Sequence, residues 1–139
     1  MTHKKSKNIY IVSIEKGEEI IETLKELSVA ESIKTASISG IGAAEKIILG
    51  YFDTITKEYT ETTLEGSHEI TNLTGNITRK DGDPYIHCHI TVAGKDFASH
   101  GGHLSSAIVS GACEIVVQIV DEEIEREFNE DVGLNMMRL

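Results

Sequence analysis

Apolar residues recur at the two-residue spacing of strands through most of the chain and at helical spacing in one segment. Residues 9–14 are almost continuously apolar and predict a strand buried on both faces. The segment after Gly17 predicts a helix, because its apolar residues recur at helical spacing with charges between them: Ile20, Ile21, Leu24 and Leu27. Six later segments have the length and pattern of strands: 35–39, 45–52, 59–64, 69–78, 85–93 and 112–120. One helix and about seven strands predict an α+β fold, a single domain with a mostly antiparallel, bifurcated sheet packed around one main helix.

Glycines mark two places where this pattern is interrupted. Gly75 lies inside the predicted strand 69–78, where a glycine indicates a bulge or the close approach of another backbone. Gly40 and Gly42 flank one isoleucine, and no third glycine follows at the spacing of a dinucleotide-binding loop. We therefore interpret residues 40–42 as a tight turn.

Charge and composition exclude several classes of protein. The 139 residues include 13 Lys and Arg against 23 Asp and Glu, a net charge of −10, which argues against a surface dedicated to nucleic-acid phosphates. No apolar run approaches the roughly 20 residues that span a bilayer, and the N-terminus lacks the apolar stretch of a secretory signal. These features predict a soluble, cytoplasmic protein without a membrane partner, whose two cysteines are reduced thiols. We expect a basic N-terminal tail, residues 1–7, a domain over residues 8–139, and solvated arms at both ends of the chain.

The predicted strand 85–93 carries the candidate chemistry, because side chains alternate between the two faces of a strand. One face receives only apolar residues: Ile86, Cys88, Ile90 and Val92. The opposite face is mostly polar: Tyr85, His87, His89 and Thr91. Two histidines separated by one residue have Cα atoms about 6.5–7 Å apart, so both imidazoles can reach one metal ion.

A third imidazole follows downstream. Gly94 and Lys95 can reverse the chain, and the segment 99–103 then contains two glycines and two histidines, which we interpret as a loop. This loop could carry His103, or alternatively His100, back to the first two histidines. Three histidines with one open position are the ligands of a catalytic zinc site, and zinc comes before iron or nickel as the metal. The alternative is that these are surface histidines that make ordinary hydrogen bonds.

Three other residues are weaker candidates for chemistry. Glu114 lies on the polar face of the predicted strand 112–120 and could be a general base or a carboxylate that orients a ligand histidine. The alternative is a solvated carboxylate. Glu69, next to His68, has the same two interpretations. Cys88 faces the predicted core, where a small apolar filler is expected and not a nucleophile.

Several blocks of this sequence, in their order and spacing, resemble the plants and prokaryotes conserved domain, the PPC domain. The resemblance covers residues 9–139, and these blocks carry it: Glu69-Ile70-x-x-Leu73-x-Gly75-Asn76-Ile77, Asp81-Gly82-x-Pro84, His87-x-His89, Gly101-Gly102-His103-Leu104 and Glu114-Ile115-Val116. It implies a homotrimer and brings with it the label of a DNA-binding protein. The family's fold is similar to that of acetolactate decarboxylase and of a zinc-dependent ester hydrolase, which implies that His87, His89 and His103 are zinc ligands.

Four hypotheses about function follow. The first is a homotrimeric PPC-domain protein with a three-histidine zinc site and a small-molecule ligand. The second is a DNA-binding protein that acts through Lys4, Lys5 and Lys7, although the chain lacks the Arg-Gly-Arg-Pro core of the plant proteins. The third is a zinc-dependent hydrolase or decarboxylase that acts on a small carboxylate or ester. The fourth is a purely structural assembly module, in which the histidines make hydrogen bonds at interfaces.

Overall fold

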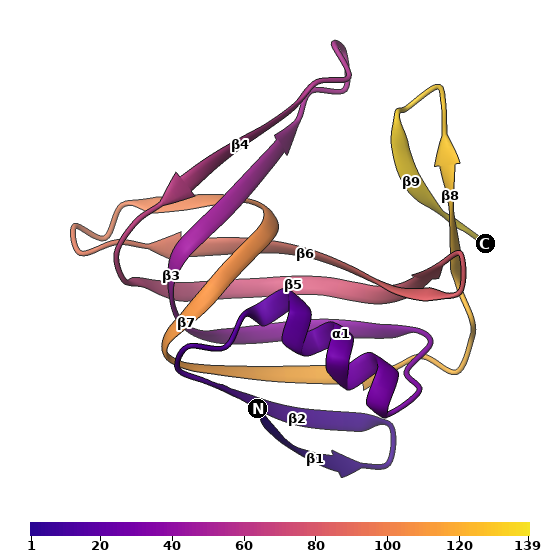
Figure 1. Ribbon diagram of the computed structural model, residues 1–139, viewed down its shortest axis with the longest axis horizontal. Helices are drawn as coiled ribbons and strands as arrows, with labels where there is room; N and C mark the ends of the chain where they lie inside the picture. The colour runs from indigo at the N-terminus through magenta and orange to yellow at the C-terminus, as the bar shows by residue number, and fades with distance from the viewer.

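The computed structural model describes residues 1–139 as one helix and a single sheet of nine strands (Figure 1). The elements are β1 (Thr2–Ser6), β2 (Ile9–Glu15), α1 (Ile20–Ala30), β3 (Ala36–Phe52), β4 (Tyr59–Leu64), β5 (His68–Lys80), β6 (Asp83–Ala93), β7 (Ser99–Ile119), β8 (Glu125–Asn129) and β9 (Leu134–Arg138). This architecture confirms the predicted single domain with one helix and a mostly antiparallel sheet.

Two long strands, β3 and β7, organise the sheet. They pair with each other along most of their length, and the first half of β3 also pairs with β5 while its second half pairs with β4. The sheet therefore divides, and β6 bridges β5 and the first residues of β7. All pairings are antiparallel except a single parallel one between β5 and β8. The hairpins β3–β4 and β8–β9 project from the same side of the sheet (Figure 1).

The helix α1 lies across one face of the sheet (Figure 1) and closes the core. Its four predicted apolar residues are all buried, and they belong to one cluster of 25 buried apolar residues. In β2, in the second half of β6 and in the last third of β7, every second side chain is buried in this cluster, as the alternating pattern requires. With 11 residues, α1 is too short to span a bilayer, which takes about 20 apolar residues.

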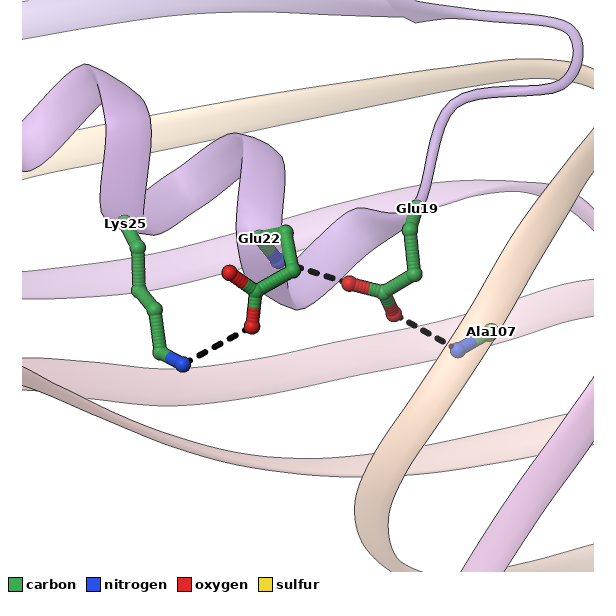
Figure 2. Close-up of polar contacts among 4 residues, drawn as sticks. All are labelled: Glu19, Glu22, Lys25 and Ala107. Carbon is green, nitrogen blue, oxygen red and sulfur yellow. Dashed lines mark hydrogen bonds and ion pairs between the residues drawn. The ribbon is translucent and has the colours of Figure 1, made fainter.

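The first turn of α1 is fixed by an acidic residue. The carboxylate of Glu19 accepts a hydrogen bond from the backbone N–H of Glu22 at 2.6 Å and another from the backbone N–H of Ala107 in β7 at 2.9 Å (Figure 2). The first bond caps the helix, and the second ties the start of the helix to the sheet. Glu22 itself pairs with Lys25 on the solvent side (Figure 2).

We expect Glu19→Ala to lower the free energy of unfolding by about 1–2 kcal/mol, because it removes the cap and leaves the N–H of Ala107 without its acceptor. Thermal or urea unfolding measures this loss. Glu22→Ala is the matched control, since it removes one neighbouring carboxylate and only an exposed ion pair. Equal losses in the two variants would contradict the assigned role of Glu19.

The structure corrects the prediction of a tight turn at residues 40–42. The segments predicted as two strands, 35–39 and 45–52, form the one continuous strand β3, and Gly40 and Gly42 lie inside it. A Cβ atom at Gly42 would lie 2.3 Å from the carbonyl oxygen of Ala112, and one at Gly40 would lie 2.9 Å from that of Glu114. The glycines are therefore needed because β7 approaches closely, and the register shift beside Gly42 follows from this contact.

Three further segments differ from the prediction. Residues 99–103 are not a loop but the first residues of β7, where they pair with β6. The expected solvated arms are also hydrogen-bonded: β1 pairs with β2 along its whole length, and the acidic C-terminal segment forms the hairpin β8–β9. All residues of β1 are nevertheless exposed. The polar sequence of this segment is therefore equally consistent with an edge strand and with a solvated arm.

Both cysteines are free and buried, and Cys88 faces the core as predicted. Burial raises the pKa of the Cys88 thiol to about 12 and that of Cys113 to about 11. Neither residue is therefore a nucleophile at neutral pH.

Candidate metal centre

The alternation predicted for residues 85–93 is observed in β6. Cys88, Ile90 and Val92 are buried in the core, whereas His87 and His89 lie on the opposite face. The partner strand β5 places Gly75 opposite Cys88, and a Cβ atom at Gly75 would lie 2.2 Å from the carbonyl oxygen of His87. This close contact explains the glycine inside β5, and it fixes the backbone of β6 where the two histidines project.

The third histidine reaches the site through strand pairing. His103 in β7 pairs directly with His89 in β6, so both side chains project from the same face. The ring centroids of His87 and His103 are 5.2 Å apart, those of His87 and His89 5.3 Å, and those of His89 and His103 5.6 Å. One nitrogen from each ring lies within 4.8 Å of the other two. Three imidazole nitrogens this close are within reach of one metal ion after small side-chain rotations, given metal–nitrogen distances of about 2.0–2.1 Å.

The surroundings keep two of these imidazoles neutral at neutral pH. Burial, followed by the nearby charges of Arg126 and of the other two histidines, lowers the pKa of His87 to about 4. Burial and the neighbouring His89 also lower the pKa of His103, against a small opposite effect of Glu61. A neutral imidazole has the free lone pair that a metal requires. These two residues can therefore bind a metal ion without first releasing a proton.

The other candidate residues lie elsewhere. His100 is in a separate hollow beside β4, so the structure brings His103, and not His100, to the first two histidines. His68 bonds through Nδ1 to the carbonyl oxygen of Gly66 at the turn before β5, and the cluster does not include it or the neighbouring Glu69. Glu114 lines another hollow, next to Gly40, and is not among the residues around the three histidines.

The three histidines line a cavity of about 570 Å³, a size typical of small-molecule sites. Its walls come from the two projecting hairpins: aromatic residues from β3–β4, and Leu134 and Asn135 from β8–β9. Lys57, in the turn between β3 and β4, donates a hydrogen bond to the carbonyl oxygen of Glu130 at 2.7 Å and so joins the two hairpins. The cavity is therefore built from segments that are far apart in the sequence.

Arg126 is a charged residue of this cavity that was not predicted from the sequence. It lies in β8, its Nη2 atom is 3.5 Å from Nδ1 of His87, and its guanidinium stacks over the ring of Tyr85 at 4.8 Å. In the sequence it is one of three scattered arginines in a region that was expected to be solvated. Residues 129–133 include an asparagine, an aspartate and a glycine, which are turn residues and the signal of a hairpin that could have revealed it.

These features define a class of protein: a small, divided antiparallel sheet that brings three imidazoles to the wall of a cavity. Comparison with known families then identifies the chain, because a family model described as "Plants and Prokaryotes Conserved (PCC) domain" matches residues 1–121. The chain therefore belongs to the PPC family, and the resemblance stated from its motifs is confirmed. No curated protein matches it.

Two solved structures show how far this similarity extends. A protein of Bacteroides thetaiotaomicron named a putative DNA-binding protein is 42% identical, with a TM-score of 0.95 and coverage of 99% of this chain and 96% of that one. A metal-containing protein of Archaeoglobus fulgidus is 34% identical, with a TM-score of 0.89 and coverage of 99% and 97%. The whole chain thus has the fold of these proteins.

The predicted likeness to acetolactate decarboxylase is also found. The enzyme of Bacillus subtilis is 13% identical, with a TM-score of 0.57, and the match covers 91% of this chain and 58% of that one. At this identity the similarity concerns the fold alone.

Proposed function

We propose that this protein is a homotrimeric metal-binding PPC protein, in which His87, His89 and His103 hold one zinc ion per chain. The observation that carries the proposal is the convergence of three imidazoles on the wall of a cavity. Imidazole is the commonest protein ligand for such metals, and three imidazoles leave a coordination position for a small molecule. The similarity to a metal-containing protein at 34% identity supports the same conclusion.

The residues present fit a zinc ion. All three donors are imidazole nitrogens, which zinc accepts and which magnesium and calcium do not prefer. Two of the rings, His87 and His103, are half-buried, so their side-chain motion is already restricted before a metal binds. When bound, zinc with an open position supplies a Lewis acid for an oxygen-containing ligand. The chain's own contribution is to hold the three nitrogens and to enclose the ligand between its hairpins.

The homotrimer implied by the family resemblance is supported by an apolar hollow on the sheet face away from α1. Ile11, Ile41 and Val116 are 53%, 57% and 39% exposed, and they line this hollow together. Apolar side chains clustered on a surface mark a site of association. We expect a mass three times the chain mass of 15.2 kDa in sedimentation equilibrium, and a smaller species for Ile41→Lys. A monomeric native protein would contradict the trimer.

DNA binding, which the name of the Bacteroides protein suggests, is not what this geometry favours. Of the three lysines expected to contact DNA, Lys4 and Lys5 lie on β1 and Lys7 lies in the turn after it. Lys5 is 3.9 Å from a carboxylate oxygen of Glu31 and stacks over Tyr10. The net charge of −10 repels phosphates, and the N-terminal segment that carries these lysines contains no arginine.

We expect zinc at about 100 times its dissociation constant to stabilise the protein by about 2.7 kcal/mol, because it binds only the folded state. For a domain of this size that is a rise of roughly 10 °C in the melting temperature. Thermal unfolding of chelator-treated protein, with and without added zinc, measures the rise. Magnesium is the control and should cause no shift. Equal melting temperatures with and without zinc would contradict the proposal.

A further inference from the structure

We propose that Arg126 makes the cavity a carboxylate-binding site, whose ligand is a small carboxylate with an apolar body bound between the three histidines and the guanidinium. The inference rests on the proposed metal centre for one end of the ligand. It adds the ligand class and the residue that selects it.

Arg126 is rigidly held and lacks a counterion. Its Nε donates to Oγ1 of Thr78 at 2.8 Å, its Nη1 to the carbonyl oxygen of Asn135 at 2.7 Å, and its Nη2 to Oδ1 of Asn76 at 2.9 Å. All three acceptors are neutral, and no ion pair joins Arg126 to a carboxylate. A guanidinium has five N–H groups, and Nη2 also lies 3.5 Å from Nδ1 of His87, so the charge is fixed in place and at least one N–H remains free for a ligand.

The charge of the cavity is opposite to that of the chain. The chain has 23 Asp and Glu residues, yet none lines the cavity, and Arg126 is its only permanently charged side chain. A bound metal would add further positive charge at the three histidines. A cavity that excludes acids and holds a guanidinium attracts an anion, because in a partly desolvated site such a charge is stabilised by an opposite one.

The side chains that line the cavity indicate what the rest of the ligand, beyond its anionic group, is like. Tyr51, Phe52, Tyr59 and Tyr85 supply four of the chain's seven aromatic rings, and Leu134 adds an aliphatic side chain. Apolar walls with a few convergent polar groups are typical of sites for small organic ligands. The planar guanidinium matches a carboxylate, and no lysine lines the cavity to help neutralise a phosphate dianion. A carboxylate with an apolar body is therefore the ligand that the cavity favours.

Arg126, the residue proposed to select the ligand, lies outside the segment that the family model matches. That segment ends at residue 121, whereas Arg126, Leu134 and Asn135 belong to the hairpin β8–β9. The histidines and the ligand-selecting residues thus come from different parts of the chain. The hairpin pairs with the main sheet only through the short parallel pairing with β5. The hydrogen bonds of Arg126 and that of Lys57 therefore also hold it over the cavity.

Isothermal titration of the zinc-loaded protein with benzoate tests the inference, with benzyl alcohol and inorganic phosphate as comparison ligands. We expect one benzoate per chain, and at least tenfold weaker binding of the neutral alcohol and of phosphate. Arg126→Gln should weaken benzoate binding at least tenfold, and Arg126→Lys should weaken it less, because the lysine keeps the charge but not the hydrogen bonds that fix the planar guanidinium in place. Arg79→Gln is the matched control: the same charge is lost outside the cavity, and benzoate affinity should stay within twofold.

Zinc content and thermal unfolding, measured on each variant, separate the possible failures. Benzoate that binds equally well to Arg126→Gln with zinc still bound would overturn the inference, as would tighter binding of phosphate than of benzoate. Loss of affinity in Arg79→Gln equal to that in Arg126→Gln would also overturn it, because the effect would then be one of overall charge. Protein that takes up no zinc but binds benzoate in an Arg126-dependent way would contradict the metal centre and support the carboxylate site.

Discussion

His89→Ala should lower the zinc affinity at least about 100-fold, the largest effect on binding that we expect from one substitution. Removing a residue that only hydrogen-bonds to a metal ligand already lowers metal affinity about 10–100-fold. His89 supplies one of the three converging nitrogens itself, so its removal should cost more. His89 is exposed, so its removal leaves no cavity in the core and the metal-free protein should remain folded. Competition with a chromogenic chelator measures the affinity.

The matched control for this variant is His100→Ala. It removes an exposed imidazole three residues from His103, in a hollow that the cluster does not share. We expect its zinc affinity to stay within twofold of the native value. Comparable losses in the two variants would show that zinc binds to surface histidines in general and not at this centre.

Gly75→Ala should have the largest effect on the fold, a loss of about 3 kcal/mol in the free energy of unfolding. The added Cβ would lie 2.2 Å from the carbonyl oxygen of His87 and 2.7 Å from Sγ of Cys88, so β5 and β6 must move apart. Overpacking of this kind costs about 1–3 kcal/mol or more, and here it also breaks ladder hydrogen bonds. The expected fall in the melting temperature is roughly 10 °C.

Gly111→Ala provides the comparison, because its added Cβ would make only an ordinary contact with Ala43 at 3.7 Å. Its stability should be unchanged or slightly increased, since alanine reduces the entropy of the unfolded chain. Similar losses at Gly75 and Gly111 would mean that any strand glycine is needed for its flexibility, and would contradict the close approach of β6 to Gly75.

The elements predicted correctly are those whose pattern is local. The apolar spacing of α1 and the alternation of β6 can be deduced from adjacent residues, because burial on one face repeats with the period of the element. The orientation of His87 and His89 away from Cys88 followed from that alternation alone. Gly75 was predicted to mark a bulge or a close backbone contact, and the structure shows the contact, because the backbone of β6 approaches it.

The features that were missed, or for which an alternative was left open, depend on contacts between distant segments. Whether His103 or His100 joins the site is decided by the register between β6 and β7, which no local pattern contains. Glycines at positions 40 and 42 are equally suited to a turn and to a strand that another backbone approaches, and only the packing of β7 distinguishes the two. Arg126 is held at the cavity by one parallel pairing and three side-chain hydrogen bonds to distant or non-adjacent residues. None of these contacts is visible in the local sequence, whose acidic residues indicated a solvated arm.

The most direct test of the metal centre is elemental analysis of tag-free protein, purified without chelators and supplied with zinc, for the native chain and for His87→Ala. His87 is half-buried beside Arg126, and its nitrogen is one of the three that converge. We predict about one zinc ion per native chain and less than a tenth of that in the variant. No zinc in the native protein, or equal zinc in both proteins, would contradict the three-histidine centre.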